Sequence, residues 1–579
     1  MRRIAVVGAG QSGLQLALGL VGAGYGVTLL SNRTAADIAA GPVMSSQCMF
    51  ESALDTERAL ELDFWEDDCP PVAGLSLAIG DGSGGRALHW AAHLDAPARS
   101  VDQRLKIPRW LDEFERRGGT LAIREAGVDD LEELARTHDL VVVAAGKGAL
   151  GGLFARDRER SPYTTPQRAL ALTYVTGMTP RPDFPAVCFN IAPGVGEYFV
   201  FPALTTSGPC EIMVFEGIPG GPMDCWADVR TPEAHLAKSL WILETFFPWE
   251  AERCRDVKLT DANGTLTGRL VPTVRRPVAT LPSGAPVLGM ADVVVLNDPI
   301  TGQGSNNAAK CAELYLESIL ARRDGSFDAD WMQKTFERYW RSYAQWVVAW
   351  TNAVLAPPPQ HVLDLFGAAA ELPGVAETIA NGFDDPRVFF PWWFDAGETA
   401  RIIREKRAQQ ESGGLDAREL RRALGMFATG VTVITTRSED GHRVGVTANS
   451  FTSLSLDPPL VLWALDRGAA SLTAFSSCTN FAVNVLASHQ HELSRQFATS
   501  ADDKFVGVEV TDGPAGVPLL TGVVARFVCR PVRQIDAGDH MVMIGEVEQY
   551  ETFGGEPLVF HSGAYRVTMR HPQLDPRPS

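Results

Sequence analysis

Three glycines near the start of the chain have the spacing that binds a dinucleotide phosphate. Gly8, Gly10 and Gly13 form a GxGxxG pattern between the apolar residues 3–7 and an apolar, helix-like stretch at 14–21. In such a turn the first glycine permits the bend, the second lets backbone approach a pyrophosphate, and the third lets the helix pack on the strand. The phosphates then lie at the positive end of the helix. The pattern predicts a dinucleotide site; a purely structural glycine turn is the alternative.

The residues after the second expected strand depart from the usual NAD pattern. Residues 27–30 predict this strand, and Ser31, Asn32 and Arg33 follow it where a carboxylate normally contacts the ribose hydroxyls. Arg33 can instead pair with a phosphate or stack on an adenine. A solvated surface arginine explains it equally well, so both interpretations stay open.

Three later segments predict that the dinucleotide is FAD. Gly146 forms a corner after the apolar run 140–145, and Asp292 follows residues 287–291 where its carboxylate can bond a ribitol. Residues 298–308 form a Pro/Gly loop that opens a helix, whose amides can face a flavin ring. The loop residues predicted to contact the cofactor are Pro299, Gly302, Gln303 and Gly304. Each segment alone is equally compatible with an ordinary loop, and it is their order that favours FAD.

Composition and charge describe an ordinary enzyme rather than a nucleic-acid or membrane protein. With 579 residues the chain should contain several domains, and 45% hydrophobic with 21% charged residues is typical of a globular fold. A net charge of −18 opposes binding to nucleic acid or anionic lipid, and no apolar run reaches membrane-spanning length. Nine dispersed cysteines and eleven histidines, without CxxC or HExxH spacing, predict no metal site and a cytoplasmic location.

The elements that must position these residues fall into three parts. Short strands broken by Pro and Gly between 170 and 281 indicate a β-sheet inserted into the nucleotide-binding domain. The polar, Gly-containing stretch 406–416 is the candidate linker. A helix at 417–427 precedes short alternating strands typical of a barrel. The predicted parts are a first domain at 1–405, a linker at 406–416 and a second domain at 417–570.

Over residues 1–405 the chain resembles the styrene and indole monooxygenases, FAD-dependent epoxidases that receive reduced flavin from a reductase. The resemblance is carried by the segments described above together with 101–105, 146–151 and 161–170. It implies an α/β, Rossmann-like FAD-binding domain whose inserted β-sheet binds substrate. It also implies that Arg104, in the first of these further segments, belongs to the cofactor site.

The same resemblance places the substrate pocket beside residues 44–49 and 96–99. The lining residues it implies are Ser45, Ser46, Gln47, Met49 and Ala98. This set is more similar to the indole branch of the family than to the styrene branch. Gln47 can hydrogen-bond an indole N–H, which styrene lacks. A polar lining without that contact is the alternative, and Met49 alone is equally compatible with core packing.

From residue 417 onwards the chain resembles the short-chain flavin reductases that serve such monooxygenases. The resemblance is carried by 427–435, 445–459, 481–486, 538–540 and 557–565. It implies a split β-barrel that binds FMN or FAD, usually as a homodimer. The flavin contacts it implies are Thr447, Asn449, Ser450, Ser471 and Lys504, and the catalytic residue near the nicotinamide of NADH is His540. A solvated strand face and a structural histidine are the alternatives.

Together the two resemblances imply a self-sufficient monooxygenase. NADH would reduce FAD in the C-terminal domain, and the N-terminal domain would use the FAD C4a-hydroperoxide formed with O₂ to epoxidise indole or styrene. Such chemistry needs no protein nucleophile or metal, because the protein orients the rings and excludes water. The alternatives are an aromatic hydroxylase that reduces its own FAD, and an NADH:flavin reductase or flavin-binding redox protein without oxygenase activity.

Overall fold

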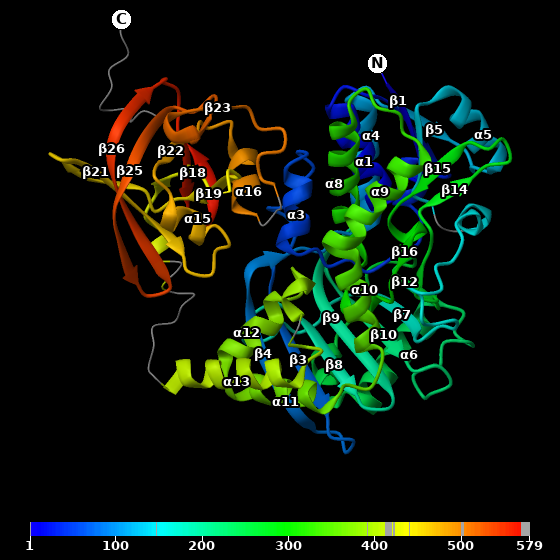
Figure 1. Cartoon of the computed structure of the whole chain (residues 1–579). Coiled ribbons are helices and arrows are strands. Elements are labelled where there is room, and N and C mark those ends of the chain that lie inside the picture. Colours follow the sequence, from blue (N-terminus) through cyan, green and yellow to red (C-terminus); the bar gives the residue numbers. More distant parts are fainter. Residues whose placement is uncertain are drawn as a thin grey trace, which may run out of the picture. The chain divides into compact units, whose positions relative to one another are not determined.

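The structure, a computed structural model (Figure 1), describes residues 2–145, 148–390, 392–411, 420, 423–438, 440–499 and 503–568. The chain divides into two compact units, Met1–Ser412 and Gly413–Ser579, here unit 1 and unit 2. Within the described ranges, no helix is long and apolar enough to cross a membrane.

Unit 1 contains a six-stranded sheet with the spatial order β14-β15-β6-β1-β2-β5. All its strands run parallel except β14, which pairs antiparallel with β15 at the edge. The strands are β1 Arg3–Val7, β2 Gly26–Ser31, β5 Thr120–Ile123, β6 Leu140–Val143, β14 Val278–Thr280 and β15 Pro286–Gly289. The central strands β1 and β6 are almost wholly buried apolar runs, as expected where helices cover both faces. The segments that follow β1, β2, β6 and β15 therefore lie at one edge of the sheet.

Unit 1 also contains an eight-stranded sheet, here the substrate sheet, with the order β11-β7-β10-β9-β8-β3-β4 and β12 beside β7. Its strands are β3 Val72–Gly80, β4 Arg86–Ala98, β7 Ala169–Thr176, β8 Ala186–Ala192, β9 Gly196–Thr205, β10 Gly208–Gly217, β11 Lys258–Leu259 and β12 Thr265–Gly268. The sequence-based limits of 170–281 were incomplete, because β3 and β4 also belong to the sheet. β3 pairs in parallel with β8, a partner far away in the sequence that no local pattern reveals.

Helices cover both faces of the substrate sheet. One face packs Trp350, Phe383 and Phe389 with residues of α10, α11 and α12, and the other packs Tyr198 and Phe215 against α6. The helices are α1 Gln11–Gly22, α2 Ala35–Ala39, α3 Glu51–Arg58, α4 Gln103–Arg116, α5 Val128–Thr137, α6 Pro232–Phe246, α7 Pro248–Ala251, α8 Gly304–Arg322, α9 Ala329–Tyr339, α10 Gln345–Val354, α11 Gln360–Glu371, α12 Pro373–Asn381 and α13 Ala396–Glu411. Shorter elements are β13 Thr273–Val274, β16 Val295–Leu296, the short π-helix Trp340–Ala344, and the 3₁₀ turns Gly148–Leu153, Glu252–Cys254, Ala291–Val293, Pro299–Thr301 and Pro386–Phe389.

The stretch predicted as a linker begins as a helix. Helix α13 continues to Glu411, so residues 406–411 are helical, and residues 412–416 lie outside the described residues. Arg401 pairs along α13 with Glu398 at 2.9 Å and Glu405 at 2.7 Å, which supports an exposed helix. The limits of the two domains and of the linker stay predictions.

Unit 2 is built mainly of antiparallel strands. A seven-stranded sheet has the order β19-β18-β22-β25-β26-β21-β20, and a three-stranded sheet has the order β17-β27-β28. The strands are β17 Thr429–Gly430, β18 Thr432–Arg437, β19 Arg443–Ala448, β20 Thr452–Leu456, β21 Pro459–Asp466, β22 Phe481–Val485, β23 Val510–Asp512, β24 Pro518–Leu520, β25 Ala525–Ala537, β26 His540–Thr552, β27 Leu558–His561 and β28 Ala564–Val567. The described residues of unit 2 also include the helices α15 Leu472–Ser477 and α16 His491–Ala498 and a 3₁₀ turn, Pro514–Gly516. Its core contains Trp463, Phe475 and Phe481.

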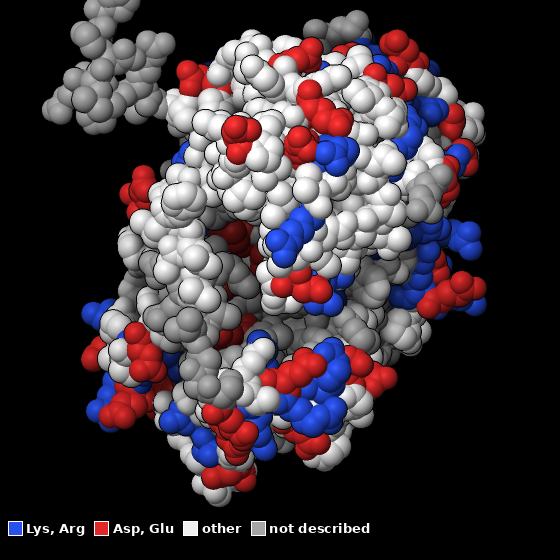
Figure 2. Space-filling view, turned by 60° about the vertical axis from the view of Figure 1, so that its left-hand side comes forward, with Lys and Arg blue, Asp and Glu red and all other residues white. Residues whose placement is uncertain are grey.

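Charged side chains of both signs are interspersed over the face shown in Figure 2. Lys and Arg lie next to Asp and Glu there, with uncharged areas between the groups. This face therefore offers no extended basic surface of the kind that binds nucleic acid.

His235 on α6 provides a test of the packing behind the substrate sheet. Its ring is 3% exposed and lies 4.7 Å from the Trp226 ring, and burial lowers the pKa of His235 to about 4. The unfolded chain therefore binds this proton more tightly than the folded chain. Stability from this group is present above the ordinary pKa of 6.5 and is lost as the pH falls towards 4.

We expect His235→Gln to reduce the acid sensitivity of the protein. Between pH 7 and pH 5 the wild type should lose about 2 kcal/mol more unfolding free energy than the variant. Denaturant unfolding followed by tryptophan fluorescence at the two pH values measures this difference. Equal losses would show that the histidine is not buried in its neutral form.

Candidate active site

The glycine turn between β1 and α1 has the geometry of a dinucleotide site. Gly8 has a φ of 117°, and a Cβ there would lie 2.7 Å from the backbone nitrogen of Ala145. A Cβ on Gly13 would lie 2.0 Å from the carbonyl oxygen of Gly8. A Cβ on Gly10, in contrast, would meet no atom within 4 Å. The first and third glycines are thus enclosed by protein, while the second faces open space where a pyrophosphate can approach.

Two further predicted cofactor segments follow β6 and β15 at the same sheet edge. Gly146 lies outside the described residues, directly after Ala145. After β15, Ala291 has a left-handed φ of 47°, and its backbone N–H donates to the Cys311 sulfur at 3.4 Å. This turn leaves Asp292 exposed while Ala291 is buried. The carboxylate is therefore accessible to a ligand at this edge.

The predicted flavin loop is held in place by its own polar residues. Pro299 begins a short 3₁₀ turn, Gly302 adopts a left-handed φ of 65°, and Gly304 begins α8. Gln303 is buried, and its side chain donates to the Phe383 carbonyl at 2.8 Å. Its side chain is thus directed into the protein, and the loop offers its backbone to a ligand.

Asn306, which sequence reasoning did not single out, joins this loop to the substrate segment. Its amide donates to the Cys48 carbonyl and its oxygen accepts from the Phe50 N–H, both at 2.9 Å. The feature of the sequence that could have revealed Asn306 is an amide side chain in the first turn of a loop-to-helix motif. Asn306 places the segments predicted for flavin and for substrate beside each other.

The predicted substrate residues surround a buried tyrosine of the substrate sheet. Gln47 is 2% exposed, and its amide lies 3.5 Å from the hydroxyl of Tyr174. The Tyr174 hydroxyl donates to the Ser45 backbone carbonyl at 2.9 Å, and the Ser45 hydroxyl donates to the side-chain amide oxygen of Gln47 at 3.2 Å. Ser46 is half-buried. The segment is therefore fixed against β7, and Tyr174 is a second residue that the sequence did not reveal.

The other two predicted substrate residues belong to a tightly packed backbone pairing. Ala98 has no exposed surface and ends β4. Met49 is 1% exposed and exchanges two backbone hydrogen bonds with Arg99, at 2.8 and 2.9 Å. Met49 thus pairs with the residue that follows Ala98, and both predicted residues are buried, Met49 within an apolar cluster.

The two predicted cofactor arginines differ in their surroundings. Arg33 is half-buried after β2, and its guanidinium lies 2.8 Å from the Met44 sulfur. Arg104 is buried, and its guanidinium donates to Asp102 and Asp261 at 2.9 Å each and to Thr205 at 3.0 Å. All three of its nitrogens therefore have protein partners.

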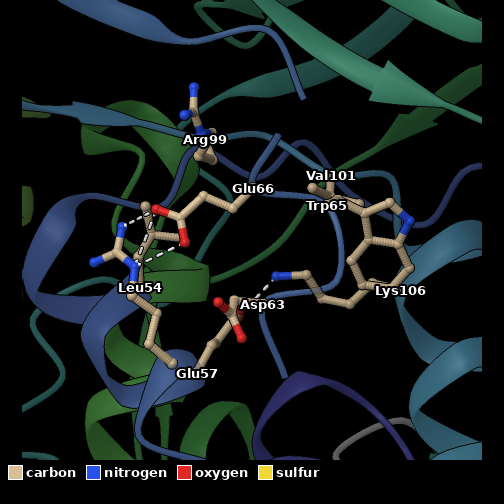
Figure 3. A pocket seen from close by; sticks show the side chains of 9 residues that line it. Leu54, Glu57, Asp63, Trp65, Glu66, Arg99, Val101 and Lys106 are labelled. Carbon is tan, nitrogen blue, oxygen red and sulfur yellow. Dashed lines mark hydrogen bonds and ion pairs between the residues drawn. The ribbon is translucent and has the colours of Figure 1, made fainter. Parts of the chain in front are cut away.

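A small pocket between α3 and α4 contains a second buried ion pair (Figure 3). Figure 3 shows the Lys106 ammonium directed at Glu57. The Lys106 Nζ lies 2.7 Å from the Glu57 Oε1. The same ammonium lies 3.2 Å from the Met49 sulfur, and Gln11 of α1 donates to Glu57 at 2.9 Å. The pocket has a volume of about 30 Å³, room for about one water. The pair thus connects the helix after the glycine turn with the substrate segment.

In unit 2 the predicted residues gather at two places. Near the end of β21, the Ser450 hydroxyl accepts from the Ala464 N–H at 2.9 Å and donates to the Ala464 carbonyl at 3.2 Å. His540 of β26 lies opposite Asp466 of β21 in the strand pairing. The His540 ring donates a 2.8 Å hydrogen bond to the Asp539 carboxylate, and the His540 side chain is 43% exposed. Ser471 precedes α15 after the same strand. These side chains can meet a ligand at this end of the sheet.

The remaining predicted residues of unit 2 lie along α16 and its neighbouring strand. The Thr447 hydroxyl donates to the Ser494 carbonyl at 2.6 Å, and the Lys504 ammonium donates to the Phe497 carbonyl at 2.8 Å. Burial lowers the pKa of Lys504. Asn449, directly after β19, is exposed. Because Asn449 directly precedes Ser450, the residues beside α16 continue in the chain into those near the end of β21.

Comparison with known proteins assigns both units. Residues 146–253 match the family described as styrene monooxygenase A putative substrate binding domain, and residues 424–569 match the flavin reductase like domain. Styrene monooxygenase StyA of Pseudomonas fluorescens is 30% identical over 397 residues, 66% of this chain and 93% of that protein. The FMN reductase (NADH) SmoA of Agrobacterium fabrum is 44% identical over 156 residues, 26% of this chain and 87% of that protein.

The chain therefore joins a flavin-dependent monooxygenase to a flavin reductase on one polypeptide. It belongs to the styrene monooxygenase family. Both resemblances predicted from the sequence are confirmed, and so are flavin and NADH as its cofactors.

Solved reductases match unit 2 by sequence. The Streptomyces globisporus NADH:FAD oxidoreductase SgcE6, in complex with NAD and FAD fragments, is 38% identical, covers 28% of this chain and 96% of its own, and has a TM-score of 0.26. The styrene monooxygenase flavin reductase SMOB of Pseudomonas putida S12 is 33% identical, covers 26% of this chain and 97% of its own, and has a TM-score of 0.24. With these scores the matches add no structural argument to the sequence similarity.

The glycine turn yields a prediction that separates folding from cofactor binding. We expect Gly10→Ala to keep the melting temperature of the protein, because its Cβ meets no atom, and to lower monooxygenase turnover at least ~10-fold by blocking the pyrophosphate. Reduction of added flavin by NADH, carried out by unit 2, should not change. Gly22→Ala on the same helix, also with open space at its Cβ, is the matched control and should behave as wild type. Unimpaired turnover of Gly10→Ala would place the pyrophosphate elsewhere.

Proposed function

We propose that this protein oxygenates an aromatic alkene, indole or styrene, with O₂, and that NADH supplies the reducing power on the same chain. The observation that carries the proposal is coverage: one polypeptide spans 93% of StyA and 87% of an NADH-dependent FMN reductase. Bound flavin, once reduced, supplies the oxygen-activating chemistry. The free cysteines at all nine positions support a cytoplasmic location.

The finer features of the fold also belong to this proposal. The parallel sheet with a glycine turn after β1 supports a Rossmann-like FAD domain, and the antiparallel sheets of unit 2 support a split β-barrel. The proposed limits are a monooxygenase domain at 1–405, a linker at 406–416 and a reductase domain at 417–570.

The residues of unit 1 fit an extended dinucleotide along one edge of the parallel sheet. The turn at Gly10 and the N-terminus of α1 would bind the pyrophosphate, with Arg33 near its adenosine half. Asp292 would accept hydrogen bonds from the ribitol. The backbone of Gly302 and Gly304 would contact the ring.

The substrate would lie against the aromatic face of the substrate sheet. Buried aromatic residues such as Trp350 and Phe383 exclude water there, which protects a reactive oxygen donor from side reactions. Gln47 is the polar group of this region that can orient an indole, by accepting from its ring N–H. Ser45 and Ser46 extend the polar lining, and Met49 and Ala98 form its wall.

In unit 2, NADH would transfer hydride to the flavin without an acid–base group. Thr447, Asn449, Ser450, Ser471 and Lys504 are the proposed flavin contacts. His540 is proposed to lie beside the nicotinamide and orient it. Its exposed position and its bond to Asp539 are compatible with this role.

The experiment that tests the function is turnover without an added reductase. Purified full-length protein, given NADH, FAD, O₂ and styrene or indole, should produce styrene oxide or the blue pigment formed from oxidised indole. Gas chromatography and absorbance detect the two products. Consumption of NADH with peroxide as the product would reduce the function to that of a flavin reductase. A Gln47→Leu variant should lose indole turnover more than styrene turnover, because styrene has no N–H for the amide oxygen to accept.

A homodimer through the reductase domain is part of the proposal. Edge strand β20 exposes Leu454 and Leu456, and Leu456 is 92% exposed. An edge strand with exposed apolar residues is a site of association.

We expect Leu456→Lys to convert a dimer into a monomer, because a buried lysine without a partner opposes association. Sedimentation of the full chain measures the mass. Val388→Lys, at an apolar residue of unit 1 that is 45% exposed, is the control and should remain dimeric. A wild type that sediments as a monomer would remove this part of the proposal.

A further inference from the structure

Glu216 is a buried carboxyl group that the proposed reaction does not use. It lies near the end of β10, has no exposed surface, and neither of its carboxyl oxygens has a hydrogen-bond partner among the described residues. Ile212 and Val214 of the same strand belong to the apolar cluster that also contains Cys48 and Ile300. Side chains alternate along a strand, so Glu216 lies on this face, towards the substrate segment and the flavin loop.

Asp298, the first residue of the flavin loop, also has a buried carboxyl oxygen without a hydrogen-bond partner in the described part of the chain. It is 1% exposed, and its Oδ1 accepts from the Ile300 N–H at 3.2 Å, which caps the turn that begins at Pro299. Its Oδ2 is buried without a partner among the described residues. Each of the two carboxyl groups shifts the pKa of the other, so the two groups lie close together. Each carboxyl group therefore has a buried oxygen that needs a hydrogen-bond partner. A carboxyl group can donate to the other one only if it is protonated.

The charges around the pair do not balance two carboxylates. Among the described residues, the other titratable groups that act on the pair include Arg168 before β7, Glu197 of β9 and Tyr163. Arg168 is already bound to both oxygens of Glu197, at 2.7 and 2.9 Å. Two further buried charges without a cation would cost several kcal/mol, and a single proton removes one of them. Burial raises the pKa of Glu216 well above its ordinary value and the pKa of Asp298 to about 6.

We propose that Glu216 and Asp298 share one proton, with the Glu216 carboxylic acid donating to the Asp298 carboxylate, and that this acid pair fastens the flavin loop to the substrate sheet. The bond provides the missing partner for both side chains. Glu216 is thus a positioning residue, which acts on the flavin site through Asp298. The role at the flavin site rests on the proposed function, while the shared proton does not.

The pair makes the loop sensitive to alkaline pH. The folded chain keeps a proton that Glu216 of the unfolded chain releases near its ordinary pKa of 4.5, so the stability from this group decreases as the pH rises above that value. When the pair finally loses its proton, two adjacent carboxylates repel each other and the loop is released. A glutamine at position 216 keeps the donor and has no proton to lose.

Infrared difference spectroscopy of the full chain at pH 8 tests the shared proton. The wild type should show the C=O stretching band of a buried carboxylic acid, and Glu216→Gln should lack it. Glu211→Gln is the matched control: Glu211 lies on the same strand, faces the opposite side, and burial raises its pKa to about 7. This control should keep the band. A wild type without the band, or a band that survives in Glu216→Gln, would overturn the proposal.

The positioning role is tested by pH profiles of stability and turnover between pH 6 and pH 9. The melting temperature and the epoxidation rate of the wild type should fall relative to Glu216→Gln as the pH rises, while NADH:flavin reduction by unit 2 follows one profile in both. Glu216→Ala, which leaves Asp298 without a donor, should melt lower than wild type, and Glu216→Gln should restore the melting temperature. Identical profiles of wild type and Glu216→Gln would overturn the positioning role. A normal band without any oxygenated product would contradict the proposed function and leave the shared proton intact.

Discussion

The close backbone approach at the end of β1 determines where the cofactor segments of unit 1 can lie. A Cβ on Gly13 would lie 2.0 Å from the Gly8 carbonyl oxygen and 2.9 Å from the Ala144 Cβ, so helix α1 begins directly against β1 and β6. This contact requires glycine at both positions and aims the helix N-terminus along the sheet edge. Because the strands are parallel, the ends of β2, β6 and β15 share that edge. The flavin loop then has to be held beside this edge of the sheet.

Buried ion pairs hold other segments of unit 1 together, each between residues distant in the sequence. Arg104 joins α4 to Asp261, and Lys106 joins α4 to Glu57 and the sulfur of Met49. Such pairs gain little stability, because desolvation offsets their attraction, but breaking one leaves a costly unpaired charge. They therefore select one arrangement of the segments. Glu216 and Asp298 connect the flavin loop to the substrate sheet with a proton instead of a cation, which makes this connection sensitive to alkaline pH.

Local patterns in the sequence were sufficient for the glycine turn between β1 and α1 and for both families. Gly8, Gly10 and Gly13 indicate their role by spacing alone, since strand, turn and helix are contiguous. The substrate sheet could not be delimited in this way, because β3 pairs with β8 across a long intervening segment. The partners of Tyr174, Asn306 and Glu216 also come from distant strands and loops. In a sequence, a glutamate within an apolar strand is typical of the exposed edge of a sheet. Only its neighbours in the fold show that the residue is buried.

The fusion of two units addresses a property of the flavin itself. Free reduced flavin reacts with O₂ in bulk water, so every molecule that escapes wastes NADH. A tether keeps the second site at an effective concentration of roughly mM, provided that the connection spans the two sites. Part of the predicted linker is helical up to Glu411, and a helix advances about 1.5 Å per residue. This helical segment is therefore shorter and stiffer than a coil with the same number of residues.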